Sequence, residues 1–116
     1  MASLELSLRL PFVADHFHDL PGFVEARHGH NWEVDATVKA ASPAEEAPFR
    51  RALESWVEGA DYRLLNEQAP LAARNPTAEA LAQWAFESLR AAGLEPVRVR
   101  IREKTNYWAS CESGTR

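Results

Sequence analysis

The sequence predicts an α+β domain in which one antiparallel sheet carries two helices on one face. Apolar and polar residues alternate in two segments near the N-terminus and again near the C-terminus, which is typical of half-buried strands. Between them lie two segments whose apolar residues recur at helical spacing. The predicted order is therefore ββααββ, with four strands in the sheet. At 116 residues, the chain corresponds to a single domain spanning residues 1–116.

Two strands joined by a short loop open the predicted sheet. The first covers residues 4–16, where leucines alternate with polar residues. The second covers residues 28–39, where Trp32 and Val38 belong to the apolar line. Residues 19–22, Asp-Leu-Pro-Gly, predict a turn between them. We therefore expect the two strands to pair antiparallel.

Both helices are predicted from their boundary residues and their apolar stripes. Residues 42–45, Ser-Pro-Ala-Glu, form a capping-box pattern, and a first helix is expected at about residues 47–59. A polar connection over residues 61–75 follows. The second helix is expected to have Asn75 as its N-cap and to end at Gly93.

The last part of the chain predicts two more strands. Val97, Val99 and Ile101 alternate with three arginines, which indicates a half-buried strand. Continuing this alternation places Glu103 on the apolar side. A turn then leads into a short final strand at residues 107–111.

Composition excludes several classes of partner. The formal net charge is −4 and basic residues are scattered, so we expect no nucleic-acid interface. No apolar run approaches the roughly 20 residues of a membrane helix, and the N-terminus lacks a signal-peptide core, so we expect no membrane partner. Cys111 is the only cysteine, which excludes an intrachain disulfide and favours a cytoplasmic location.

Three histidines form the candidate site. His28 and His30 are two residues apart, so both imidazoles project from the same side of an extended strand. An HxH pair alone is weak evidence, because packed or surface histidines also occur at this spacing. His16, at the end of the first strand, supplies a third imidazole. Three histidines with one open coordination position are typical of a catalytic zinc site.

Four motifs together resemble the 6-pyruvoyl-tetrahydropterin synthase family, which includes the 6-carboxy-tetrahydropterin synthases of queuosine biosynthesis. They are Phe12-x-Ala14-x-His16, His28-Gly29-His30-Asn31, Pro76-Thr77-Ala78-Glu79 and a strand ending in Glu103. The resemblance implies a tunnelling (T-) fold, in which the sheets of several subunits join into a barrel. It also implies a homo-oligomer, a trimer or hexamer, with active sites between subunits.

The resemblance assigns roles to individual residues. His16, His28 and His30 are expected to bind zinc, Glu103 to anchor the pterin ring, and Thr77 to help hold the pterin. A carboxylate suits this task because it accepts two hydrogen bonds from the ring in a fork.

The proton-transfer residues of the family are altered in this sequence. Val24 stands where the family has a cysteine, and Asp61-Tyr62 stands where it has an Asp-His pair. A tyrosine, with an ordinary pKa of about 10, transfers protons poorly at neutral pH. Glu25, three residues before His28, matches a subgroup that is associated with cleaving dihydroneopterin triphosphate to 6-hydroxymethyl-dihydropterin, for folate. The candidate catalytic residues are therefore Glu25, Asp61 and Tyr62.

The three histidines, the family resemblance and the altered proton-transfer residues together leave two candidate functions. The first is a zinc-dependent pterin lyase acting on the side chain of 7,8-dihydroneopterin triphosphate or a close relative. The second is a non-catalytic relative that binds zinc and a pterin, which Val24 and Tyr62 favour because neither replaces the chemistry of the family residue.

Overall fold

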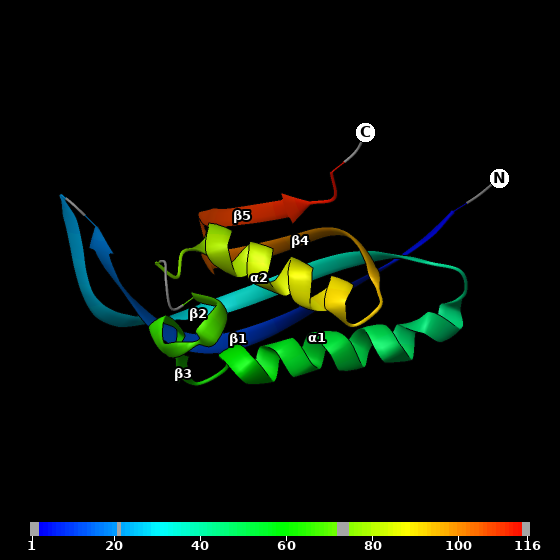
Figure 1. Ribbon diagram of the computed structural model, residues 1–116, viewed down its shortest axis with the longest axis horizontal. Helices are drawn as coiled ribbons and strands as arrows, with labels where there is room; N and C mark the ends of the chain where they lie inside the picture. The colour runs from blue at the N-terminus through cyan, green and yellow to red at the C-terminus, as the bar shows by residue number, and fades with distance from the viewer. Residues whose placement is uncertain (1–2, 21, 72–74, 115–116) are drawn as a thin grey trace.

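The computed structural model describes residues 3–20, 22–71 and 75–114, without the side chains of residues 18–20 and 23. The described residues form five strands and two α-helices, which Figure 1 shows as a sheet with helices on one side. In chain order they are β1 (Leu4–Leu20), β2 (Phe23–Ala40), α1 (Glu46–Ala60), β3 (Arg63–Leu64), α2 (Ala78–Ala91), β4 (Glu95–Lys104) and β5 (Tyr107–Glu112). Short 3-10 turns lie at Pro43–Glu45, Leu65–Glu67 and Ala69–Leu71.

The sheet has the strand order β3-β1-β2-β4-β5. Its long strands pair antiparallel, as predicted, but β3 pairs parallel with β1, so the sheet is mixed and has five strands. The prediction of four antiparallel strands was therefore wrong by one element. With two residues, β3 is too short to show an alternation in the sequence.

The β1–β2 hairpin is longer than predicted and projects beyond the layer of helices (Figure 1). The two strands pair from Leu4–Ala40 to His16–His28. After a shift of register, pairing continues from His18–Glu25 to Leu20–Phe23. The paired region therefore extends beyond the predicted strand ends at residues 16 and 28.

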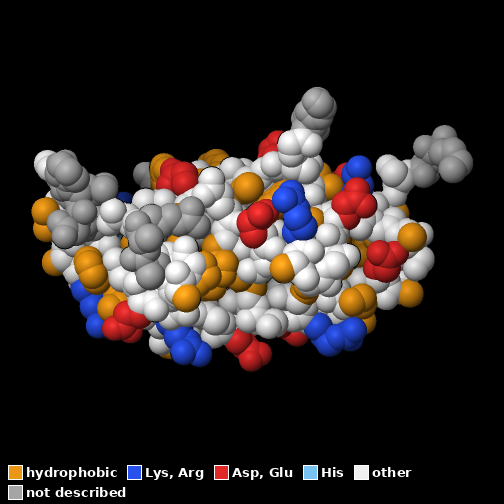
Figure 2. Space-filling model, in the orientation of Figure 1, with side chains coloured by type: hydrophobic (Ala, Val, Ile, Leu, Met, Phe, Trp, Pro, Cys, Tyr) orange, Lys and Arg blue, Asp and Glu red, His pale blue; other side chains and the backbone are white. Residues whose placement is uncertain are grey.

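The core lies between the sheet and the two helices. Trp32, Phe49 and Leu81 are among its fully buried side chains and come from β2, α1 and α2. The indole rings of Trp56 and Trp84 meet across the two helices, with centroids 5.1 Å apart. On the helix-bearing side, Figure 2 shows basic and acidic side chains interspersed with apolar ones.

The boundaries of the helices differ from the predictions by a few residues. Ser42 forms a capping box with Glu45 around the 3-10 turn that precedes α1. The N-cap of α2 is Thr77 and not Asn75, because the Thr77 hydroxyl accepts a hydrogen bond from the N–H of Ala80. Gly93 follows α2 with a φ of 89°, a backbone conformation that glycine adopts without steric cost.

The connection between the helices is less polar than predicted. Leu65 and Leu71 are fully buried in the core, while residues 72–74 of the predicted connection lie outside the described residues. In the described part of the chain, neither helix is long and apolar enough to span a membrane.

Candidate metal centre

The β1–β2 hairpin brings the three predicted histidines together. His16 is directly opposite His28 in the ladder, and His30 follows on the same side of β2. The ring centroid of His16 lies 4.6 Å from that of His28 and 5.0 Å from that of His30. Between the two β2 histidines, a Cβ on Gly29 would stand 2.6 Å from Oδ1 of Asp15, so glycine lets that carboxylate approach the strand.

Backbone carbonyls orient two of the imidazoles. Nδ1 of His16 is 2.9 Å from the carbonyl oxygen of Pro76, and Nδ1 of His28 is 2.7 Å from that of Ala26. A carbonyl oxygen only accepts hydrogen bonds, so each Nδ1 carries the ring proton and each Nε2 presents a lone pair. Such second partners commonly fix the tautomer of metal-binding histidines.

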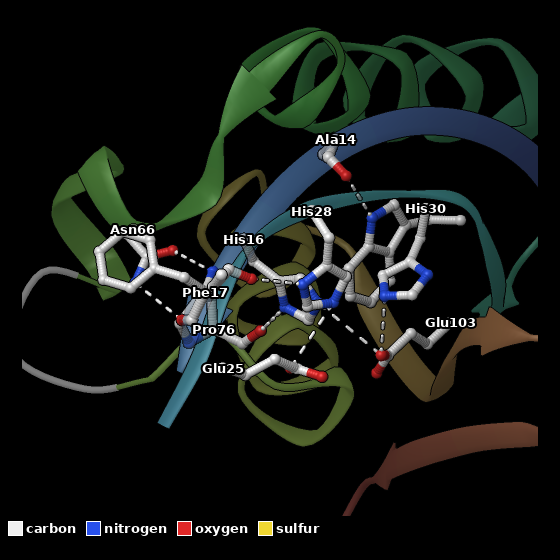
Figure 3. A network of polar contacts seen from close by, with 11 residues as sticks. Ala14, His16, Phe17, Glu25, His28, His30, Asn66, Pro76 and Glu103 are labelled. Atoms are coloured by element: carbon white, nitrogen blue, oxygen red, sulfur yellow. Dashed lines mark hydrogen bonds and ion pairs between the residues drawn. The ribbon is translucent and has the colours of Figure 1, made fainter. Parts of the chain in front are cut away.

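The two lone pairs face each other. Nε2 of His16 and Nε2 of His28 are 3.0 Å apart (Figure 3). With both ring protons on Nδ1, neither Nε2 can donate to the other, and the contact is repulsive without a cation between them. The pair therefore fits a shared metal ion.

His30 completes the set of three. Its Nε2 is buried and has no hydrogen-bond partner among the described residues, which is costly unless a ligand satisfies it. Burial lowers the pKa of His30 below 6.5, and His28 lowers it further, against an opposing effect of Glu103. The ring is therefore neutral at pH 7, which is the form that binds metals.

Glu103 and Glu25 border the histidines. Oε2 of Glu103, from the end of β4, is 3.2 Å from Nε2 of His30, and Oε1 of Glu25 is 3.6 Å from Nε2 of His28 (Figure 3). Glu103 and the three histidines form a group in which the four possible ligand atoms lie within 4.8 Å of one another. Three imidazoles and a carboxylate are ligands that suit zinc.

The other predicted site residues make their contacts elsewhere in this chain. Oδ1 of Asp61 accepts a hydrogen bond from the N–H of Val13 at 2.9 Å, and Tyr62 is 83% exposed. Thr77 caps α2, directly after Pro76, whose carbonyl oxygen faces His16. Val24, at the position of the family cysteine, is 78% exposed.

Asn66 supports the site and was not predicted. Its side-chain amide accepts from the N–H of Phe17 at 3.0 Å and donates to the carbonyl of the same residue at 3.1 Å. These contacts fall at an irregularity in β1, where the register with β2 shifts between His16 and His18. A lone asparagine in a connecting segment gives no sequence signal for such a role. The side chain of His18, the fourth histidine of the chain, is outside the described part of the structure.

The fold and the histidine cluster define a class of protein: an α+β protein with a candidate metal centre toward the turn end of a long β1–β2 hairpin. The chain belongs to the 6-pyruvoyl tetrahydropterin synthase family, whose model matches residues 5–114. This confirms the resemblance seen in the sequence motifs. A relative from Archaeoglobus fulgidus, provisionally named 6-carboxy-5,6,7,8-tetrahydropterin synthase, is 29% identical over 99 residues, spanning 79% of this chain and 83% of the relative.

Solved structures share the fold. The 6-pyruvoyl tetrahydropterin synthase of Caenorhabditis elegans superimposes with a TM-score of 0.80, at 17% identity, over 98% of each chain. A catalytic-residue mutant of Plasmodium vivax 6-pyruvoyltetrahydropterin synthase, with glutamate replaced by alanine, gives a TM-score of 0.73 at 11% identity, over 99% of this chain and 100% of that chain. At these identities the similarity establishes the T-fold architecture of the single chain.

Proposed function

We propose that this protein is a zinc-dependent pterin lyase that cleaves the side chain of 7,8-dihydroneopterin triphosphate or a close relative. The observation that carries the proposal is the convergence of the three histidine Nε2 atoms beside two carboxylates. Membership of the 6-pyruvoyl tetrahydropterin synthase family supports the substrate class. His16, His28 and His30 would hold the zinc, and the orphaned Nε2 of His30 is the feature that fits it best.

Each residue near the centre has a role in the proposed reaction. Bound zinc would supply a Lewis acid that polarises the oxygens of the substrate side chain. Glu25 accepts a proton from that side chain, acting as the general base close to His28. The carbonyl of Pro76 keeps the His16 ring in its metal-binding tautomer.

Glu25 is the preferred base for two reasons. Its Oε1 lies 3.6 Å from Nε2 of His28, whereas Asp61 and Tyr62 contact the backbone of Val13. The P. vivax relative, moreover, has a glutamate as a catalytic residue. The subgroup that Glu25 resembles is associated with cleavage to 6-hydroxymethyl-dihydropterin, so we expect this product and not a 6-pyruvoyl or 6-carboxy product. Asp61 and Tyr62 could still act on the site of a neighbouring copy, if this chain forms the trimer or hexamer that the resemblance implies.

Product analysis tests the proposal. Zinc-loaded protein is incubated anaerobically with 7,8-dihydroneopterin triphosphate, and the products are identified by mass spectrometry. We expect 6-hydroxymethyl-dihydropterin. Glu25→Gln should lose turnover while keeping its zinc, whereas Glu54→Gln, on the exposed side of α1, should keep both. A 6-pyruvoyl or 6-carboxy product would mean that another residue acts as the base.

Zinc binding is tested separately by His28→Ala. Removing one of the three imidazoles should lower the zinc content of purified protein well below one ion per chain, as measured by elemental analysis. Asn31→Ala, an exposed neighbour on β2, is the matched control and should keep its zinc. Unchanged zinc in His28→Ala would exclude the metal assignment.

A non-catalytic zinc- and pterin-binding protein is the second candidate. Val24 cannot move a proton and is 78% exposed, and Tyr62 points into solvent in this chain. This function predicts quenching of protein fluorescence by a pterin, together with unchanged substrate after long incubation. Turnover that depends on Glu25 would exclude it.

A further inference from the structure

Of the two carboxylates that border the histidines, Glu103 approaches two of the imidazoles. Its Oε2 is 3.2 Å from Nε2 of His30 and 3.7 Å from Nε2 of His16, and its side chain is only 12% exposed. In a tetrahedral zinc site with bonds of about 2.0–2.1 Å, neighbouring ligand atoms are roughly 3.3 Å apart. The separations seen here, including the 3.0 Å between His16 and His28, bracket that value.

The contact between Glu103 and His30 is short but is not a hydrogen bond. Nε2 of His30 has no hydrogen-bond partner among the described residues, although Oε2 of Glu103 is 3.2 Å away. The distance is suitable, so the angle is what fails. The nitrogen and the oxygen thus lie close together without being hydrogen-bonded (Figure 3), and their separation is compatible with two ligands on one ion.

Glu103 lies at a β-bulge, at the end of the strand pairing of β4. Arg102 pairs with Trp108 and Lys104 with Tyr107, so Glu103 is the extra residue of a β-bulge between β4 and β5. The pairing of β4 with β2 ends one residue earlier, at Arg102 opposite Glu33. Bulges commonly re-aim a side chain beside a functional site.

A fourth protein ligand conflicts with catalysis. Catalytic zinc sites keep one position open, whereas three histidines and a carboxylate fill a tetrahedral sphere. We infer that Glu103 is a displaceable fourth ligand: it closes the metal site in the absence of substrate and leaves it when a pterin side chain binds. The released carboxylate can then accept two hydrogen bonds from N–H groups of the pterin ring, one with each oxygen. The identity of the incoming ligand rests on the proposed function.

Cobalt substitution tests this inference, because the visible spectrum of Co²⁺ reports the number and type of its ligands. In the absence of a pterin, Glu103→Ala should change the spectrum of the cobalt protein and weaken cobalt binding about tenfold or more. Glu103→Gln keeps the volume of the side chain without its charge, and should show the same change if the alanine variant folds poorly. Glu25→Ala is the matched control: it removes the other bordering carboxylate and should leave the spectrum as in the wild type.

Adding 6-hydroxymethyl-7,8-dihydropterin tests the displacement. We expect the wild-type cobalt spectrum to shift on binding, and the spectrum of Glu103→Gln to shift less. Identical spectra of the wild type and both Glu103 variants would overturn the ligand role. Pterin binding, seen as fluorescence quenching, with an unchanged wild-type spectrum would overturn the displacement alone. Absence of any pterin binding would overturn the displacement and the proposed function together.

Discussion

Tyr62 combines an exposed side chain with a strained backbone. Its φ is 57°, and it is the one residue other than glycine with positive φ among those described. A left-handed backbone costs about 1–2 kcal/mol for a residue with a Cβ, and the 83% exposed ring gives little packing in return. We expect Tyr62→Gly to be more stable than Tyr62→Ala by about 1 kcal/mol in urea denaturation, because only glycine relieves the strain. Equal stability of the two variants would contradict this account.

Strain at an exposed tyrosine also points to a role outside the isolated chain. Strained residues persist where the surrounding structure or a function requires them. Tyr62 is fixed at the edge of the sheet by the hydrogen bond from its N–H to the carbonyl of Val13 and by Asp61, which accepts from the N–H of Val13. Both residues are thus hydrogen-bonded to the backbone of Val13 at the edge of the sheet, while the ring of Tyr62 is exposed.

His30 makes the stability of the metal-free protein depend on pH. Because burial lowers its pKa below 6.5, the unfolded chain takes up a proton near pH 6.5 that the folded chain does not. The contribution of His30 to stability is complete above pH 6.5 and is lost as the pH falls from there through the folded pKa. We expect a lower urea midpoint for metal-free protein at about pH 5.5 than at about pH 7.5, and a smaller difference in His30→Gln. The same pH dependence in both proteins would assign the effect to other groups.

At the scale of elements, Asn66 fixes the β1 irregularity that follows His16. It makes two hydrogen bonds with the backbone of Phe17, at the point where the register between β1 and β2 shifts. Asn66→Ala should therefore lower stability by about 1–2 kcal/mol and also weaken zinc binding, because His16 loses its fixed position. Chemical denaturation and zinc titration measure the two effects. Glu67→Ala, at the adjacent exposed position, should change neither.

Periodicity explains which elements could be predicted from the sequence. The long strands carry enough alternating residues to set their faces, and this alone placed His16, His28 and His30 on one side. The same parity put Glu103 on that side. The two residues of β3 are too few to show an alternation of apolar and polar residues. The bulge at Glu103 likewise leaves no pattern in the sequence from which it could be predicted.

Local competition explains the remaining differences. Asn75 and Thr77 are both residue types that favour the N-cap position. The sequence alone does not show which of the two side chains will accept a hydrogen bond from the first turn of the helix. The carbonyls of Pro76 and Ala26, which orient His16 and His28, are equally invisible, since every residue has one. Contacts made by the backbone require the fold to be known first.

At the scale of the whole molecule, the described sheet has one edge without a further strand and one edge that is paired over two residues only. β5 is the last strand on one side, and on the other side β3 covers β1 only at Ala14 and Asp15 in the described residues. Unpaired edges present free N–H and C=O groups that readily pair with another chain. Asp61 and Tyr62 lie at the β1 edge, so pairing of two copies along their edges could carry these residues toward the metal centre of a neighbour.

Mixing two defective variants tests whether the active site is shared between chains. His28→Ala lacks the metal centre, and Asp61→Asn lacks the candidate group at the sheet edge, so we expect each alone to turn over substrate poorly. If the edge of one chain serves the centre of the next, unfolding and refolding the two together gives some interfaces with both parts intact, about a quarter for random 1:1 assembly. Activity of the mixture near that share of wild type would support a shared site. Activity no greater than the mean of the two variants, from oligomers shown to be mixed by native mass spectrometry, would place the whole site within one chain.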